Sequence, residues 1–168
     1  MSKVDAIALL KADHAAVKKL FAQEKKLAKN NSAKVKTFNE IKAALEVHAT
    51  IEEEIFYPAV KKSRSEHVKD EVREGYEEHQ QIKNLLTQIA AITPADETYD
   101  MKIKVLMEDV EHHVKDEETE MFPDARKFLS ESRLMELRTE LEERKQELAP
   151  GPVAKASSGK HATAHIAK

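Results

Sequence analysis

The chain has 168 residues, and its 28 Lys and Arg against 31 Asp and Glu leave a formal net charge of −3. This length suits one domain with a self-sufficient core, and the near balance of charge argues against nucleic acid or an anionic membrane as a partner. Cysteine is absent, which excludes disulfides, thiolate metal sites and cysteine nucleophiles.

The N-terminal segment lacks an apolar run of signal-peptide length, because Asp5 and Lys11 interrupt it. No stretch of the sequence is apolar for the length that a bilayer requires. We therefore expect a soluble, cytoplasmic protein.

Apolar residues at helical spacing predict four long helices, over about 4–29, 32–62, 66–91 and from about 96 onward. Ser32 is expected to cap the second helix, and Thr93-Pro94 to end the third. A fifth amphipathic helix is expected over 131–148, where Pro150 follows. The remaining Ala, Ser, Lys and His residues are typical of a disordered tail.

Short connections between long helices favour antiparallel neighbours. The predicted fold is therefore all-α, an antiparallel up-down-up-down four-helix bundle. The domain division that follows is a bundle over 1–130, an additional helix over 131–148 and a disordered tail over 149–168.

The sequence repeats itself at an offset of 65 residues. Each half contains an acidic residue and a histidine, a separation of 34 residues to a second histidine, an H-x-x-x-E-E motif and an aromatic-proline step, either Tyr57-Pro58 or Phe122-Pro123. Proline inside a helix removes a hydrogen bond and bends the helix, so each step is expected to mark a bend. The shared pattern predicts a bundle with an internal two-fold repeat and one site built from both halves.

The histidine and the first glutamate of each motif are four residues apart, and therefore lie on one face of a helix. A single histidine on an apolar face is most often a core residue with a hydrogen-bond partner. Two copies in the same register favour a metal site instead, since buried carboxylates and imidazoles are costly without compensating cations. The six candidate metal ligands are His14, His48, Glu52, His79, His113 and Glu117.

These motifs resemble the hemerythrin-like family, in particular its HHE cation-binding branch with the pattern H…HxxxE…H…HxxxE, and the match runs from His14 to Pro123. The resemblance implies a four-helix bundle around two non-haem iron ions joined by an oxo or hydroxo bridge. It also implies that the six candidates are the ligands and that both glutamates bridge the metals.

One position departs from the oxygen-carrying hemerythrins. They have a histidine one turn after the third-helix histidine, where this sequence has Lys83. A protonated lysine cannot bind a metal, so each iron is expected to keep an open position unless water, Tyr76, Glu53 or Glu118 fills it.

Several neighbouring residues have a predicted role outside the ligand set. Glu53, Glu118, Asp13 and Glu78 are expected at the surface or behind the histidines, holding their free N–H groups. Tyr76 is expected to pack in the core. The four remaining histidines are expected in solvent, and these are His67, His112, His161 and His165.

Two functions stay open for a di-iron protein of this kind. One is binding or sensing of dioxygen, nitric oxide or iron, and the other is redox catalysis such as catalase-like peroxide decomposition. A helical interaction module is the alternative without metal. The Glu-x-x-His motif of ferritin-like proteins and the His-Glu-x-x-His motif of zinc proteases are both absent. The sequence leaves the oligomeric state and the physiological ligand undetermined.

Overall fold

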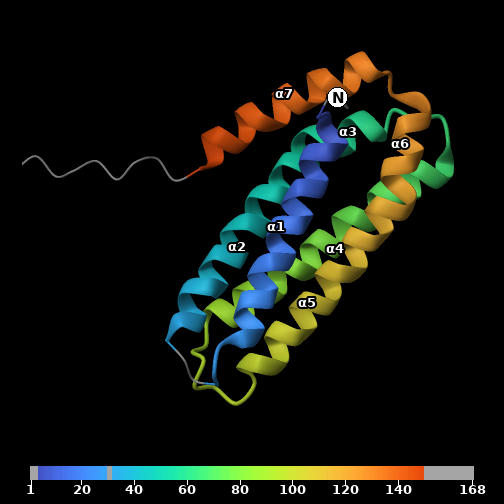
Figure 1. The fold of residues 1–168 in the computed structure, drawn as a ribbon. Helices are drawn as coiled ribbons and strands as arrows, with labels where there is room; N and C mark the ends of the chain where they lie inside the picture. Colours follow the sequence, from blue (N-terminus) through green and yellow to red (C-terminus); the bar gives the residue numbers. More distant parts are fainter. Residues whose placement is uncertain (1–3, 30–31, 150–168) are drawn as a thin grey trace, which may run out of the picture.

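The computed structural model describes residues 4–29 and 32–149, and the regular structure within these ranges is entirely helical. The bundle in Figure 1 consists of α1 (Ala6–Lys26), α2 (Ala33–Ile51), α4 (Glu66–Ala90) and α5 (Tyr99–Asp116). The helix of α2 continues through η1 (Glu52–Phe56) and α3 (Tyr57–Val60). In the same way, the helix of α5 continues through η2 (Glu117–Met121) and α6 (Phe122–Phe128). The last helix is α7 (Glu131–Leu148). The predicted all-α class is confirmed.

Side-chain capping explains where the helices begin. The Asp5 carboxylate accepts a hydrogen bond from the Ala8 N–H at 3.0 Å, so α1 begins at Ala6. The helix predicted from about residue 96 begins only at Tyr99, because the Asp96 carboxylate accepts from the N–H and hydroxyl of Thr98 and forms a turn there.

The predicted side-chain cap at Ser32 is wrong. Ser32 precedes α2, but its backbone is already helical, with φ −60° and ψ −24°, and its side chain makes no capping hydrogen bond. A capping side chain normally needs an extended backbone, which Ser65 and Ser130 have at the starts of α4 and α7.

A wide π-helical turn precedes each internal proline. Pro58 and Pro123 have no N–H to donate, and the preceding aromatic residue donates instead to a carbonyl five residues back, Tyr57 to Glu52 and Phe122 to Glu117. Such turns occur frequently at functional sites. Here each turn begins with a glutamate of the H-x-x-x-E motif, and the aromatic residue that follows the turn lies in the core.

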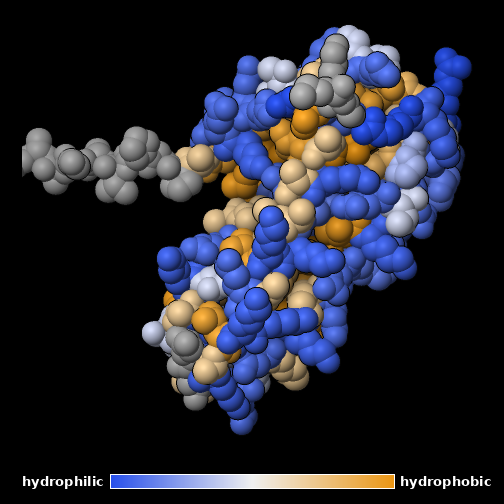
Figure 2. Space-filling view, in the orientation of Figure 1, coloured by the Kyte–Doolittle hydropathy of each residue, from blue (hydrophilic) through white to orange (hydrophobic). Residues whose placement is uncertain are grey.

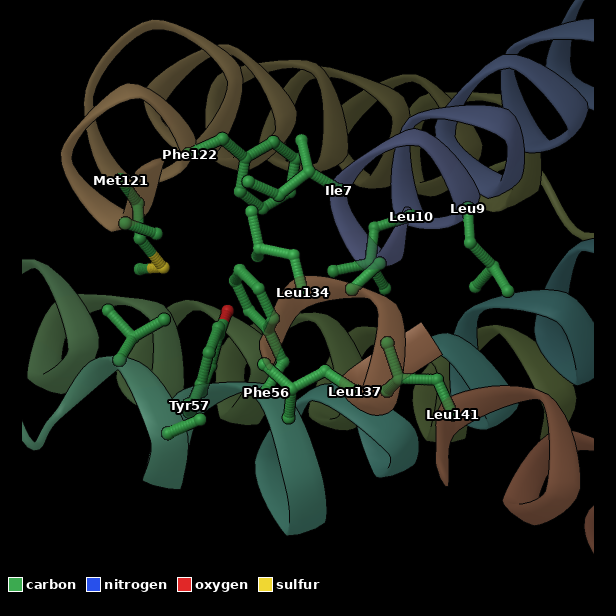
Figure 3. Packing of buried hydrophobic residues seen from close by; sticks show 14 of the residues in the cluster. Ile7, Leu9, Leu10, Phe56, Tyr57, Met121, Phe122, Leu134, Leu137 and Leu141 are labelled. Carbon is green, nitrogen blue, oxygen red and sulfur yellow. The ribbon is translucent and has the colours of Figure 1, made fainter. Parts of the chain in front are cut away.

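Two apolar clusters fill the bundle, one on each side of the six predicted ligands. One cluster occupies the end formed by the inter-helix loops and includes Phe21, Ile41 and Leu106. The other lies under α7, which crosses the opposite end of the bundle in Figure 1 and buries Leu134, Leu137 and Leu141 there. Figure 3 shows these three leucines close to side chains from α1, η1 and α6. The α7 helix therefore closes one end of the core.

The outer surface is strongly polar. On the face drawn in Figure 2, hydrophilic side chains cover most of the helices, and apolar residues show in narrow strips between them. None of the described helices has both the length and the apolar character needed to cross a membrane.

Candidate metal centre

The six predicted ligands come together in the middle of the bundle, between the two apolar clusters. The histidines come from α1, α2, α4 and α5, and the glutamates from η1 and η2. Each of the six residues is no more than 6% exposed. Their burial sets them apart from the ordinary charged surface of a helix.

The imidazoles form two pairs, one in each half of the repeat. The Nε2 atoms of His14 and His48 are 3.1 Å apart, and those of His79 and His113 are 3.0 Å apart. All four Nε2 atoms therefore face inward, which is the orientation of a metal-binding imidazole.

Each glutamate contacts one histidine of each pair. Glu52 Oε2 lies 3.2 Å from His48 Nε2 and 3.3 Å from His79 Nε2. Glu117 Oε2 lies 3.2 Å from His14 Nε2 and 3.5 Å from His113 Nε2. The two carboxylates thus join the pairs into a single site.

The arrangement of the donor atoms is better explained by a bound cation than by hydrogen bonds among the side chains. Within the described ranges, both carboxylate oxygens of Glu52 and Oε2 of Glu117 are buried without a hydrogen-bond partner. Ligand atoms of His14, His48, Glu52 and Glu117 lie within 4.8 Å of one another, and so do those of Glu52 with His79 and His113. Buried oxygens of this kind normally have partners, and bound metal cations would supply them.

Without a metal ion, the buried groups of the site have strongly shifted pKa values. Burial, followed by repulsion from Glu117, raises the pKa of Glu52 well above its ordinary value. Burial also opposes ionisation of Glu117, but the adjacent His113 and His14 outweigh it and lower that pKa. Burial lowers the pKa of His48 to about 4. Without a cation, burial and mutual repulsion therefore oppose ionisation of both carboxyl groups at once.

A second layer of carboxylates lies behind the histidines. The Nδ1 atoms of three histidines are 2.7–2.9 Å from a carboxylate oxygen, and the fourth, His48, is 3.6 Å from Asp13. The partners, in the order His14, His48, His79 and His113, are Glu118, Asp13, Glu53 and Glu78. These are the four acids expected to hold the free N–H groups, and they fix Nε2 as the atom that faces inward.

Lysines anchor two of these outer carboxylates. The ammonium group of Lys83 donates to both oxygens of Glu53, at 2.6 and 2.9 Å. Lys145 of α7 donates to Asp13. Lys83 thus contacts a residue behind His79, and its role is to position Glu53.

Tyr57 is the site residue that the sequence analysis missed. It is fully buried, and its hydroxyl donates to Glu117 Oε1 at 2.8 Å and lies 3.4 Å from His79 Nε2. The equivalent residue in the other half is Phe122, whose ring stacks on His14. At this position the two halves therefore differ by one hydroxyl group, and Tyr57 reaches the inward-facing atoms, whereas Tyr76, Glu53 and Glu118 bond elsewhere.

A glycine in the middle of a helix was the sequence feature that could have identified Tyr57. A Cβ atom on Gly75 of α4 would lie 2.6 Å from the Tyr57 hydroxyl oxygen. Glycine is unfavourable inside a helix, so its presence one turn before His79 indicates a close approach. Tyr76, by contrast, donates to the Glu53 carbonyl oxygen at 3.0 Å and packs against Tyr57.

The remaining histidines lie outside this site. The side chains of His67 and His112 are 65% and 66% exposed, as expected. His161 and His165, together with the predicted disordered tail from Pro150 onward, lie outside the described residues.

A hollow of about 770 Å³ between α1 and α5 reaches His14 from the surface. Four lysines and two glutamates are among the residues that line it, so its charged rim is predominantly basic. Its lining lysines are Lys11, Lys18, Lys25 and Lys115.

Comparison with known proteins agrees with this geometry. The hemerythrin HHE cation binding domain model matches residues 5–125. The chain therefore belongs to the hemerythrin HHE cation-binding family, as the motif predicted.

Two relatives are informative. The fold is similar to the crystal structure of a hemerythrin HHE cation binding domain-containing protein from Mycobacterium kansasii, with a TM-score of 0.75 and 22% identity over 86% of this chain and 87% of that chain. A DNA nickase from Nostoc sp. is 31% identical over 141 residues, which are 83% of this chain and 39% of the nickase. The chain thus spans well under half the length of that relative, and the expectation that nucleic acid is not a partner stays a prediction.

Proposed function

We propose that the chain is a non-haem di-iron protein that binds or senses a small ligand such as dioxygen, nitric oxide or peroxide. The observation that carries the proposal is that Glu52 and Glu117 each contact one histidine of each pair while three of their four oxygens lack hydrogen-bond partners. Two cations held by the four histidines and the two glutamates would satisfy all of these atoms.

The donor set supports iron as the metal. Imidazole and carboxylate ligands together suit iron, and the sequence has no cysteine for metals that prefer thiolates. Family membership supports a cation at this position. When bound, iron would supply a Lewis acid that can also change oxidation state.

The protein's own residues would orient and protect that centre. Three of the outer carboxylates accept the Nδ1 proton of their histidines, and Asp13 lies 3.6 Å from His48 Nδ1, so that Nε2 of each histidine stays free to bind. Lys83 and Lys145 hold Glu53 and Asp13 in place by ion pairs. The apolar clusters on both sides keep bulk water away from the carboxylates.

Access for the small ligand is supported by the hollow that reaches His14. Small neutral molecules and anions are compatible with its basic rim. The opposite histidine pair is covered by the Tyr57 ring, which stacks on His79 with 5.4 Å between ring centroids. We therefore place ligand entry on the His14 side.

The test is metal content together with the visible spectrum. Protein purified after iron-replete expression should contain two irons per chain, and its spectrum should change on adding dioxygen, nitric oxide or peroxide. His48→Ala and Glu117→Ala should lose most of the metal. Less than half an iron per wild-type chain, or a full load in both variants, would contradict the proposal.

Tyr57 favours peroxide decomposition as a second candidate function. Its hydroxyl donates to Glu117 Oε1 and its oxygen lies 3.4 Å from His79 Nε2, where a phenol could instead donate to an oxygen atom of a substrate. The net reaction converts two hydrogen peroxide molecules into two waters and one dioxygen, and needs no other reactant.

Peroxide consumption by the iron-loaded protein tests this second function. Tyr57→Phe should slow it by about 100-fold, the lower end of what general acid–base catalysis contributes. Tyr99→Phe is the matched control, since Tyr99 is buried at the opposite end of the bundle, where its hydroxyl donates to the Lys34 carbonyl. Equal rates in wild type and Tyr57→Phe would exclude a catalytic role for this hydroxyl.

A further inference from the structure

A second hollow approaches the centre from another side, between α4 and η2. It has a volume of about 280 Å³, and Glu117 is among its lining residues. Six of the nine residues that line it are acidic, and within the described part of the chain it has no lysine or arginine lining. Its acidic residues are Glu71, Glu74, Glu78, Asp116, Glu117 and Glu120.

The acidic character of this hollow belongs to one half of the repeat only. At the offset of 65 residues, Glu71, Glu74, Asp116 and Glu120 correspond to Ala6, Leu9, Ile51 and Ile55. Those four apolar residues belong to, or pack against, the core cluster that includes the leucines of α7. The same groove is therefore closed and apolar in the first half, and open and acidic in the second.

Glu71 is not an ordinary surface carboxylate. Its side chain is 9% exposed, and both of its oxygens are buried without a hydrogen-bond partner among the described residues. Burial raises the pKa of Glu71. Burying an ionised carboxylate costs free energy unless a cation or a hydrogen-bond donor compensates its charge. Solvent does not provide that compensation here, because both oxygens are buried.

Two neighbouring side chains complete a set of cation ligands at Glu71. Ligand atoms of His67, Glu71 and Glu120 lie within 4.8 Å of one another, and His67 Nε2 is 3.5 Å from Glu71 Oε1. Lys127, whose charge also acts on Glu71, is already paired with Asp124 at 2.5 Å. One imidazole and two carboxylates suit a divalent transition metal.

We propose that His67, Glu71 and Glu120 bind a divalent cation, and that the acidic hollow conducts it to Glu117 and loads the buried centre. The hollow at His14 has the opposite charge, so cations and small oxidants would reach the centre from different sides. A row of like charges lowers the energy of an approaching ion of opposite sign and speeds its entry. This inference rests on the proposed function, because it assigns the way in which that metal site is filled.

The test measures the rate at which Co²⁺ enters the metal-free protein, followed by the visible absorption of the bound ion. Glu71→Gln/Glu120→Gln should load about tenfold more slowly than wild type, the lower end of the effect of electrostatic steering. The buried centre of this variant should still fill with two Co²⁺ per chain, as in wild type. Glu46→Gln is the matched control, since it removes one charge from an exposed position on α2.

Calorimetric titration with Mn²⁺ tests the outer site whether or not the inner centre fills. A weak binding event should be present in wild type and Glu46→Gln and lost in Glu71→Gln/Glu120→Gln. Equal loading rates in the double variant and Glu46→Gln, or an unchanged weak event, would overturn the inference. Failure of wild type to bind metal at the buried centre would instead contradict the proposed function.

Discussion

At the scale of single residues, the contact between Tyr57 and Gly75 determines the asymmetry of the centre. The Tyr57 ring lies between the rings of His79 and Tyr76, and its hydroxyl reaches Glu117 only because α4 has no Cβ at position 75. At the equivalent position in the first half the chain has Leu10. One phenol and one glycine therefore distinguish two histidine pairs that the repeat would otherwise make alike.

Replacing Gly75 with alanine should destabilise the protein, although alanine is favoured over glycine in a helix by about 1 kcal/mol. The added Cβ would lie 2.6 Å from the Tyr57 hydroxyl oxygen and 2.9 Å from Cζ, so the ring must move. The free energy of unfolding from urea denaturation measures the effect.

Gly75→Ala/Tyr57→Phe provides the control for this prediction. Removing the Tyr57 hydroxyl relieves the shortest contact of the added Cβ. Tyr57→Phe should therefore lower the free energy of unfolding less in the Gly75→Ala background than in wild type. Strict additivity of the two changes would show that the contact does not limit position 75.

At the scale of helices, a buried ion network holds the loop end of the bundle together. Lys34 of α2 lies 3.1 Å from the Glu24 carboxylate of α1 and 2.7 Å from that of Asp100 in α5. The side chains of Lys34 and Glu24 are 5% and 3% exposed. The network joins three helices at the end of the bundle remote from α7.

Lys34→Ala should therefore destabilise the protein by about 3 kcal/mol, because it leaves a buried carboxylate without its cation. Thermal unfolding of the wild type and the variant at equal metal load measures the effect. Lys36→Ala serves as the control, since that side chain is 83% exposed and lies on the same helix. Similar small effects of both substitutions would show that Glu24 is not held by Lys34.

At the scale of the whole molecule, α7 makes an internally repeated bundle asymmetric. It packs on α1, α2 and η1, and so covers one half of the repeat and leaves the equivalent groove of the other half open. Its Lys145 also pairs with Asp13, one of the outer carboxylates of the first half. The first half of the repeat thus carries the packing with α7, and the second half carries the open acidic hollow that leads to the centre.

Removal of the metal should lower the stability of the entire domain. Without cations, Glu52 and Glu117 face each other in a buried site where both cannot ionise freely. A ligand that binds only the folded state stabilises it by mass action, by about 2.7 kcal/mol at a hundredfold excess over its dissociation constant. Melting temperatures of the metal-free and iron-loaded proteins measure the difference.

His48→Ala is the control for the effect of metal. Its melting temperature should respond only weakly to added iron, since one histidine pair is broken. Coincident melting temperatures for the metal-free and iron-loaded wild type would show that the six residues do not form one buried metal site.

The sequence by itself determined the helical class, the approximate extents of the long helices and the six candidate ligands that the structure buries together. These follow from short-range periodicities, since residues four apart on a helix share a face whatever the tertiary context. The outer carboxylates were also predictable, because they adjoin the ligands in both halves. Because the sequence repeats, each of these patterns occurs once in each half.

Only the tertiary structure decided which residues complete the site and how it is reached. Tyr57 reaches His79 because a π-helical turn precedes it and because Gly75 on another helix leaves room for its ring. No pattern within one helix contains both of these features. Lys83 contacts Glu53, a residue 30 positions earlier. The packing of α7 determines which groove is closed, because burial depends on contacts between segments far apart in the chain.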